Sequence, residues 1–413
     1  MKVLTHTSAR TPDLAAWLAA GGGEGLQHAL TETAAIIPAL ADAGLRGMGG
    51  AGFPAATKWQ AVADADADEK WILCNGNEDE PGTFKDHFLL TQTPHQVIEG
   101  ALIAALATGA TGIVVYANPH AGGTISGLED AVEQWRRHPL FDRVRAHLDQ
   151  PFELTVQLSS GLYVGGEETG AIAAVNGGFP FPREKPPWPA QDGIHGQPTL
   201  VNNVETLALA THVLRHGADW FRQLGNTAPG TKLFSLSGDI LRPGLHELPM
   251  GTSLRALIED HGGGMLAGTP FKAVFTGGPS NTLLTASDLD VALDFDSLRA
   301  RGSRLGTGAM IVVGAGTSIV RKTAEYVTFF ADSSCGQCPP CKIGTHQVAR
   351  ILQRIDQGWG QPDDLEALDN LVELLLGSGR CGLVDGAATV LASSLRAFRT
   401  EYEQAIGNAN RLP

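Results

Sequence analysis

The stretch SCGQCPPC at residues 334–341 places three cysteines in a Cys-x2-Cys-x2-Cys run, and a further cysteine follows at position 381. A glycine and a Pro-Pro pair inside the run favour a loop over a helix. Three thiolates on one turn, closed by a fourth from a distant segment, are the ligand set of a cubane iron–sulfur cluster. A structural zinc site also accepts four cysteines, although such sites usually combine two Cys-x2-Cys pairs. The candidate metal ligands are Cys335, Cys338, Cys341 and Cys381.

Length and charge narrow the class of protein. A chain of 413 residues is too long for one core, so two or three domains are expected. A formal net charge of −14 argues against nucleic acid as a partner. The most apolar region, residues 97–117, is interrupted by three glycines and predicts a buried helix and a strand, not a membrane span. We expect a cytoplasmic protein without direct membrane insertion, held at most on the inner face of the cell membrane through partner subunits.

A glycine-rich loop, GLRGMGGAGFP, occupies residues 44–54. Glycines let backbone N–H groups come close to a phosphate or a flat ring, and Lys58 follows where a cation could meet a phosphate. The loop is not the GxGxxG dinucleotide fingerprint, and the same composition also occurs in plain turns.

Two expected turns, at residues 76–82 and 163–170, contain acidic side chains, and the first also contains an amide side chain. Residues 71–75 read as a buried strand that runs into GNEDEPG at 76–82, and α/β sheets place ligand groups at such strand ends. A solvated acidic turn is the alternative. Residues 163–170, YVGGEETG, read as a glycine turn before a helix, where glutamate is also an ordinary cap. Residues 183–189 predict a stiff extended segment that carries Lys185 and Trp188 toward a site, and residues 201–206 are expected to open an apolar helix.

The pattern of elements divides the chain into a leader and three domains. Residues 94–176 alternate helix and strand patterns, as in an α/β layer structure. Short strands at 232–236, 244–248 and 273–276, with a helix at 253–261, predict a small α+β domain, and the remainder reads as helical. The expected boundaries are 1–28 for a poorly patterned leader, 29–228 for the α/β domain, 229–319 for the α+β domain and 320–413 for the helical domain.

Taken together and in this order, seven blocks resemble the NADH-binding flavoprotein subunit of respiratory complex I. The same family supplies the diaphorase subunits of NAD-linked formate dehydrogenases and hydrogenases. The matching blocks, which extend from about residue 44 to 390, are GLRGMGGAGFP, CNGNEDEPGTFKD, YVGGEETG, KPPWPA, NNVETL, SCGQCPPC and RCGLVDGA.

The resemblance implies a fold and a set of cofactor contacts. The fold is a Rossmann-like α/β domain for FMN and NADH, a β-grasp-like α+β domain, and a C-terminal helical bundle carrying a [4Fe–4S] cluster. The implied FMN contacts are Gly47, Gly49, Gly50, Lys58, Asn75, Asn77, Glu78, Tyr163, Gly166, Glu167, Val201, Asn202, Asn203 and Thr206. The implied NADH contacts are Phe53, Glu80, Glu168, Lys185 and Trp188.

Four positions depart from the family pattern while the cysteine ligands are kept. Met48 stands where a basic residue is common, Asn77 replaces an aspartate, Gly165 a cysteine, and Trp188 a phenylalanine. A specialised diaphorase is therefore as well supported as the respiratory subunit.

The sequence thus predicts an NADH:acceptor oxidoreductase module that moves electrons between NAD(H), FMN and a [4Fe–4S] cluster within a complex such as NADH:quinone oxidoreductase. An NAD-reducing diaphorase subunit of a formate dehydrogenase or hydrogenase is the alternative. A non-catalytic scaffold with a four-cysteine zinc site is the alternative of a different class. No side chain is expected to act as a general acid or base. The expected partners are a thioredoxin-like [2Fe–2S] subunit and larger iron–sulfur, molybdenum, hydrogenase or complex I subunits.

Overall fold

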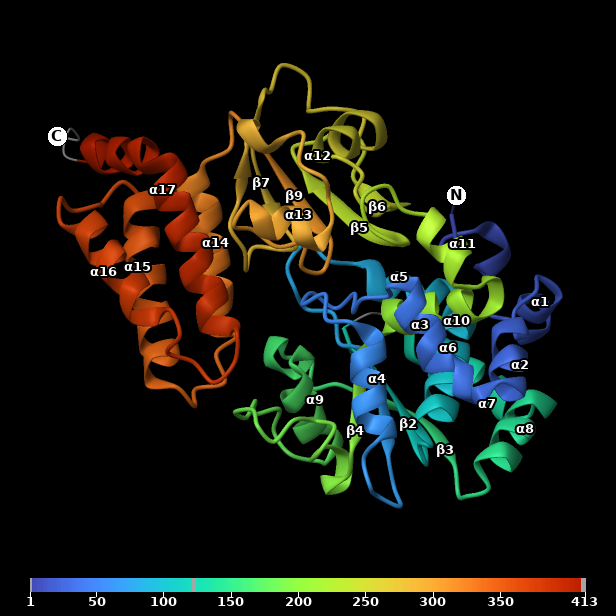
Figure 1. The fold of residues 1–413 in the computed structure, drawn as a ribbon. Helices are drawn as coiled ribbons and strands as arrows, with labels where there is room; N and C mark the ends of the chain where they lie inside the picture. Colours follow the sequence, from blue (N-terminus) through green and yellow to red (C-terminus); the bar gives the residue numbers. More distant parts are fainter. Residues whose placement is uncertain (1, 121–123, 410–413) are drawn as a thin grey trace.

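The computed structural model describes residues 2–120 and 124–409, which form three parts that follow one another along the chain (Figure 1). The first part is built on a four-stranded parallel sheet with the strand order β3-β2-β1-β4. Its central strands are buried almost throughout, as expected of apolar runs in a parallel sheet covered on both faces. The strands are β1 (Trp71–Gly76), β2 (Gly112–Ala117), β3 (Glu153–Leu158) and β4 (Thr199–Asn203).

Helices cover both faces of this sheet. On one face α6 (Pro94–Thr108) and α10 (Val204–His216) pack together so closely that a Cβ on Gly100 would lie 2.0 Å from the Leu207 carbonyl oxygen. The expected helix and strand within residues 97–117 are α6 and β2. On the other face α9 (Glu168–Val175) contributes Ala171 and Ile172 to a small separate core. The remaining helices are α3 (Ile36–Ala43), α4 (Ala55–Ala63), α5 (Lys85–Gln92), α7 (Thr124–Arg136), α8 (Pro139–Leu148) and α11 (Ala218–Gln223).

Two local expectations differ from the structure. The helix expected from residue 201 begins only at Val204, because Thr199–Asn203 pairs with β1 and Asn203 caps the helix by accepting a hydrogen bond from the Glu205 amide. The extended segment expected over residues 183–189 instead bends and contains two cis X-Pro peptide bonds. The tertiary amide before proline makes this isomer accessible.

The N-terminal segment also differs from the poorly patterned leader expected over residues 1–28. From residue 2 onward it contains α1 (Leu14–Ala19) and α2 (Glu24–Thr31), and Leu4, Trp17 and Leu26 are buried in the main core. The segment is also tied to the second part, because the Glu247 carboxylate accepts hydrogen bonds from the backbone amides of residues 3–5. Leu14, Trp17 and Leu18 do recur at helical spacing, a short pattern that sequence reasoning missed, and α2 is buried through its contacts with α6 and α10.

The second part is a five-stranded mixed sheet with the order β6-β5-β9-β7-β8. Only β5 and β9 run parallel, and the other pairs are antiparallel. The helix expected at 253–261 is α12 (Leu254–Ala256), continued by a π-helical turn at Leu257–His261. The strands are β5 (Thr231–Gly238), β6 (Gly244–Pro249), β7 (Phe271–Thr276), β8 (Leu284–Thr285) and β9 (Ala309–Gly314), and α13 (Phe295–Ala300) precedes β9.

The third part is helical and lies beside the mixed sheet, at the left in Figure 1. It contains α14 (Ile319–Asp332), α15 (Thr345–Asp356), α16 (Asp364–Leu375) and α17 (Leu383–Ala409). The cysteine run lies between α14 and α15, and Cys381 lies two residues before the start of α17. In the part of the chain that the structure describes, no helix combines the length and apolarity needed to cross a bilayer.

Candidate functional site

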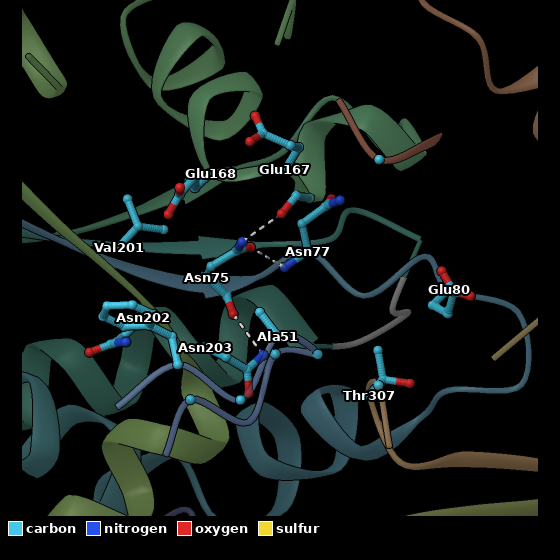
Figure 2. A pocket seen from close by; sticks show the side chains of 18 of the residues that line it. Ala51, Asn75, Asn77, Glu80, Glu167, Glu168, Val201, Asn202, Asn203 and Thr307 are labelled. Carbon is cyan, nitrogen blue, oxygen red and sulfur yellow. Dashed lines mark hydrogen bonds between the residues drawn. The ribbon is translucent and has the colours of Figure 1, made fainter. Parts of the chain in front are cut away.

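A cavity of about 850 Å³ lies where the three parts of the chain meet. The α/β part contributes the glycine loop and the carboxyl ends of β1 and β4 (Figure 2), as expected for ligand sites in parallel sheets. The mixed-sheet part contributes Gly277, Ser280, Asn281, Arg304, Gly306 and Thr307, and the helical part contributes Cys381, Gly382 and Leu383.

Every flavin and nucleotide contact expected from the sequence lines this cavity, with the exception of Thr206. Thr206 is fully buried behind the glycine loop, where its hydroxyl oxygen accepts a hydrogen bond of 2.8 Å from the Met48 amide. The lining candidates are Gly47, Gly49, Gly50, Phe53, Lys58, Asn75, Asn77, Glu78, Glu80, Tyr163, Gly166, Glu167, Glu168, Lys185, Trp188, Val201, Asn202 and Asn203.

The glycine loop presents bare backbone to the cavity. The Gly47 amide donates to the Phe53 carbonyl oxygen at 2.8 Å, which closes the loop on itself. A Cβ on Gly49 would lie 3.1 Å from Cβ of Asn203, and one on Gly166, across the cavity, 3.2 Å from Nδ2 of Asn77. Side chains at these positions would therefore crowd the amides that line the cavity. Because Gly47 and Gly49 carry no side chain, the loop backbone can approach a flat ring or a phosphate at these positions.

Amide side chains at the carboxyl end of β1 lie next to the glycine turn that contains Gly166 (Figure 2). Asn75 Nδ2 donates to the Gly166 carbonyl oxygen at 2.9 Å, and Asn75 Oδ1 accepts from the Asn77 amide at 3.1 Å. Asn77 Oδ1 is buried and finds no hydrogen-bond partner within the described chain. Buried acceptors are rarely left unpaired, so this atom is available to a ring N–H of a bound flavin. The residues present fit a flavin nucleotide.

A carboxylate lies directly beside Asn77. Asn77 Nδ2 donates to Asp79 Oδ2 at 2.7 Å, and Asn118 Nδ2 donates to Asp79 Oδ1 at 2.6 Å. Asp79 also lines the cavity, although the sequence did not identify it as a cofactor contact. The negative charge that the amide at position 77 lacks is thus present two residues further along.

Asn77→Asp is expected to lower the midpoint potential of bound FMN, because a second carboxylate beside Asp79 disfavours reduced, anionic flavin. Two charges about 5 Å apart at an effective dielectric near 20 repel by about 3 kcal/mol before screening. Over a two-electron couple this is at most several tens of millivolts, since about 1.4 kcal/mol corresponds to 30 mV. Redox titration of the flavin measures it. Asp79→Asn is the matched control and should shift the potential upward; an unchanged or raised potential in Asn77→Asp would contradict the expectation.

Glu78, which follows the carboxyl end of β1, stabilises the start of α5. Its carboxylate accepts hydrogen bonds of 2.9 Å from the amides of Asp86 and His87 and so caps the first turn of α5. Burial, with the nearby Asp86 carboxylate as the second cause, raises the pKa of Glu78 to about 7. The residue therefore connects α5 to the cavity wall.

Beneath the glycine loop lies a fully buried network of ion pairs. Lys85 Nζ contacts Asp86 Oδ1 at 2.6 Å and Glu205 Oε2 at 2.9 Å, and Lys232 Nζ contacts the same Glu205 oxygen at 3.1 Å. Lys232 also donates to the Met48 carbonyl oxygen at 3.3 Å. Burial opposes ionisation of Glu205, but the two lysines outweigh it and hold its pKa below the usual value. The network ties the glycine loop to α5, α10 and β5.

The nucleotide candidates form a charged and aromatic group at the cavity rim. Glu168 pairs with both Lys58 and Lys185 at 2.8 Å, and Lys185 also contacts Glu167 at 3.2 Å. The Lys185 ammonium lies 5.6 Å from the centre of the Trp188 ring. Trp188 and Phe53 are about half exposed, at 53% and 52%, so both rings offer a face to a planar ligand. The two lysines lower the pKa of Glu168 although burial opposes them.

Glu80 and Tyr163 connect the α/β part to the other two. Tyr163 Oη donates to Glu80 Oε2 at 2.7 Å, and the Ser280 amide donates to Glu80 Oε1 at 3.3 Å. Burial raises the pKa of Glu80 despite these hydrogen bonds. The Tyr163 ring packs edge-on against Phe329 and Phe330 of α14. Glu80 therefore lies at the junction of the three parts.

The four candidate metal ligands line a second, smaller cavity together with Val164, Ser334, Gly379, Arg380, Leu383 and Val384. Its wall holds thiols and no carboxylate or imidazole, which is the donor chemistry of an iron–sulfur cluster. Among the described residues, no three Cys, His, Asp or Glu side chains are arranged to hold a single metal ion. The four thiols therefore match the ligand demand of a [4Fe–4S] cluster.

Sequence reasoning did not identify the walls that the second and third parts add to the main cavity. Arg304 and Thr307 lie in a loop without a recognisable ligand pattern, and Thr307 Oγ1 reaches Thr83 Oγ1 at 2.8 Å. The sequence predicted Cys381 as a metal ligand only, whereas this residue lines both cavities. The only sequence signal for this dual position is that Gly382 and Leu383 belong to the RCGLVDGA block.

Two family models match the chain, and their matches agree with these two sites. The Nuo51 FMN-binding domain matches residues 40–212, and the NADH-ubiquinone oxidoreductase-F iron-sulfur binding region matches residues 321–405. The first match contains the glycine loop and strands β1–β4, and the second contains all four candidate cysteines. The chain therefore has an FMN-binding domain and a [4Fe–4S] binding region.

Similar proteins cover almost the whole chain. An NADH-quinone oxidoreductase subunit of Rhizobium meliloti (strain 1021) is 40% identical over 94% of this chain and 93% of its own length. NADP-reducing hydrogenase subunit HndC of Solidesulfovibrio fructosivorans is 40% identical over 94% of this chain and 79% of its own. The crystal structure of an air-oxidized NAD+-reducing [NiFe]-hydrogenase matches with a TM-score of 0.84 and 34% identity over 96% of this chain and 67% of that one. This protein belongs to the family of FMN-binding, iron–sulfur subunits of NADH-quinone oxidoreductases, which also contains diaphorase subunits of NAD-reducing hydrogenases.

Proposed function

We propose that the chain is the electron-input subunit of a larger complex, in which it connects NAD(H) oxidation or reduction to a [4Fe–4S] cluster through FMN. The observation that carries this proposal is the position of Cys381, which lines both the flavin-sized cavity and the four-cysteine cavity. FMN, when bound, supplies the exchange between hydride and single-electron chemistry. The chain supplies position and electrostatics, and no side chain is assigned as a general acid or base.

The residues proposed to hold FMN surround the carboxyl ends of β1 and β4. Gly47, Gly49 and Gly50 provide close backbone approach, and Thr206 holds the loop from behind through Met48. Asn75, Asn77 and Asn203 offer amide groups to the ring system (Figure 2). The remaining proposed contacts are Lys58, Glu78, Tyr163, Gly166, Glu167, Val201 and Asn202.

The nicotinamide nucleotide is proposed to enter over the rim formed by Phe53, Glu168, Lys185 and Trp188, with Glu80 at the far wall. The exposure of the two aromatic rings supports stacking on planar groups, and Lys185 at the cavity wall is the proposed partner of a phosphate. Carboxylates at Glu80 and Glu168 suit ribose hydroxyls. Cys335, Cys338, Cys341 and Cys381 are the proposed cluster ligands.

The organisation around this site is proposed as follows. The mixed sheet of residues 229–319 is a β-grasp-like domain, residues 320–413 are the cluster domain, and residues 29–228 are the Rossmann-like domain, to which residues 2–28 are added. The partners are a thioredoxin-like [2Fe–2S] subunit and larger subunits of a complex I-like or hydrogenase-like assembly. These partners keep the chain on the cytoplasmic side, without insertion of the chain itself into a membrane.

A hydrogenase-linked role, with electrons flowing toward NAD+, is the second candidate. The NADP-reducing hydrogenase subunit and the NAD+-reducing [NiFe]-hydrogenase match the chain about as well as the quinone oxidoreductase subunits do. The copurifying subunits distinguish the two roles, because a quinone-linked and a hydrogenase-linked complex contain different partners.

Purified protein is expected to carry FMN and iron, and to reduce ferricyanide with NADH at a kcat/KM at least about tenfold above that for NADPH. A carboxylate near the adenosine ribose repels a 2′-phosphate, and about 1.4 kcal/mol of repulsion is tenfold. Comparable kcat/KM values for the two nucleotides would contradict the preference, while protein with zinc and no flavin would contradict the function.

Glu168→Gln separates the contributions of the two carboxylates. This variant leaves Lys58 and Lys185 without their shared partner and is expected to increase kcat/KM for NADPH more than that for NADH. An unchanged NADPH:NADH ratio would assign the preference to Glu80.

A further inference from the structure

The proposed nucleotide rim and the cysteine run are in direct contact through one side chain. Gln337, which lies between Cys335 and Cys338, donates from Nε2 to the Pro182 carbonyl oxygen at 2.9 Å. The same Nε2 lies 3.5 Å from Cys335 Sγ, within the distance of an N–H···S hydrogen bond. One amide group therefore bridges a candidate cluster ligand and the segment that precedes Lys185.

The other end of this amide is also held. Arg380 Nη1 donates to Gln337 Oε1 at 3.1 Å, and Arg380 Nε lies 3.5 Å from Glu184 Oε1. Arg380 directly precedes Cys381, so both cysteine segments contact the rim segment. Arg380 holds the oxygen of the Gln337 amide. The amide nitrogen therefore has few orientations in which it can donate to Pro182 and Cys335 together.

On its other side, the rim segment is attached to the residues proposed to bind the nucleotide. Only two residues separate Pro182 from Lys185, whose ammonium pairs with Glu167 and Glu168 and lies over Trp188. The Arg183 amide donates to Thr169 Oγ1 at 3.0 Å, which fastens the segment to the start of α9. A ligand that engages Lys185 and Trp188 therefore acts on the same short segment that Gln337 contacts.

We propose that Gln337 couples nucleotide occupancy to the redox potential of the cluster at the four cysteines. The coupling rests on the proposed function, since it presupposes both the nucleotide rim and the cluster. Hydrogen bonds to the sulfurs of a cluster's ligands favour its reduced, more negative form and so raise its potential. Pro182 and Cys335 accept from the two hydrogens of one NH2 group, and the shorter bond, to Pro182, holds that group away from an optimal approach to Cys335 Sγ.

The expected direction follows from this shared donor. A nucleotide that draws Lys185 and Trp188 toward the cavity weakens the bond from Gln337 to Pro182 and leaves the amide to Cys335. The cluster potential then rises when the nucleotide binds. By linkage, the nucleotide binds more tightly to the protein with a reduced cluster, and a coupling at the low end of the common range is about fivefold.

The test is an EPR-monitored redox titration of the cluster in the full-length holoprotein, with and without saturating ADP-ribose. ADP-ribose has the adenosine and pyrophosphate groups of NADH but no nicotinamide, so it does not exchange electrons with the protein. Gln337→Met removes the amide at nearly constant side-chain length. Gln353→Met is the matched control, because Gln353 on α15 donates to Thr328 Oγ1 at 2.9 Å in the same helical part, on an element other than the two cysteine segments.

Wild type and Gln353→Met are expected to show the same rise in cluster potential with ADP-ribose. Gln337→Met should start from a lower potential and show no rise, while its iron content and ADP-ribose affinity with an oxidised cluster stay near the wild-type values. Arg380→Met leaves Gln337 in place but frees its oxygen, and should reduce the rise.

A wild-type cluster potential that ignores ADP-ribose, or an equal rise in Gln337→Met, would overturn the coupling while leaving the proposed function intact. Absence of any cluster signal in wild type would instead contradict the proposed function. If Gln337→Met loses its iron, the Arg380→Met titration decides, and a full wild-type rise in that variant would refute the coupling.

Discussion

Cys381→Ser is expected to abolish the cluster EPR signal and most of the bound iron, because a serine hydroxyl does not replace a soft thiolate ligand. The variant should keep its FMN. Cys381 is one of several residues in the cavity wall, and serine nearly preserves its shape, so the flavin contacts on the glycine loop, β1 and β4 remain. The dissociation constant for FMN should rise by less than tenfold, or about 1.4 kcal/mol.

The fifth cysteine provides the control for this experiment. Cys74 is buried in β1 and lies in the core of the α/β part, away from the other cysteines. Cys74→Ala should leave iron, FMN and the EPR signal unchanged, with a loss of stability on the order of 1 kcal/mol. Iron retained in Cys381→Ser would remove Cys381 from the ligand set. Loss of FMN together with iron would mean that the helical wall is required to hold the flavin.

Glu205→Gln is expected to destabilise the α/β part by about 3–5 kcal/mol, the cost of leaving buried charges without their partner. Glu205 is the shared acceptor for two fully buried lysines, Lys85 at 2.9 Å and Lys232 at 3.1 Å. It also accepts the Leu233 amide at 2.8 Å. Glutamine has the same shape but no charge, so Asp86 and the nearby Glu78 carboxylate would have to balance both ammonium groups.

The same substitution should weaken FMN binding, because Lys232 also donates to the carbonyl oxygen of Met48 in the glycine loop. Urea unfolding followed by tryptophan fluorescence measures the stability, and flavin fluorescence measures the affinity. Glu24→Gln is the matched control. Its partner Arg215 lies at a similar distance, 2.9 Å, but the Glu24 side chain is 53% exposed, so a loss below about 1 kcal/mol is expected. Equal losses of stability in the two variants would show that the buried ion pairs contribute no more to the free energy of unfolding than the exposed pair does.

Local patterns in the sequence predicted most elements of the fold and the candidate residues on the α/β side of the main cavity. The apolar runs at residues 71–75 and 113–116 predicted central strands because a parallel sheet covered on both faces needs continuous apolar stretches. The spacing of Cys335, Cys338 and Cys341 predicted these three residues as metal ligands because thiolate chemistry and turn geometry are both local. The glycine loop was visible for the same reason, since a run of glycines is itself the structural feature.

Other features were decided only by tertiary structure. The N-terminal segment has only short helical patterns, and its burial depends on α6 and α10, where Glu99 and His212 contact Trp17. Strand β4 was hidden because Thr199–Asn203 gains its partner from β1, which lies more than a hundred residues earlier in the chain. Neither of these contacts has a local signature.

Tertiary structure also decides which side chains lie next to each candidate site residue. The sequence placed Asn77 at the cavity, but the carboxylate of Asp79 next to its amide follows from how the turn after β1 folds. It separated Cys381 from the flavin contacts, whereas packing of the helical part against the sheet end makes Cys381 a wall of both cavities. The chemistry of each residue and the spacing between motifs can be read from the sequence. Charge balance, cavity walls and contacts between distant segments form only when the chain folds, because they depend on residues that are far apart in the sequence.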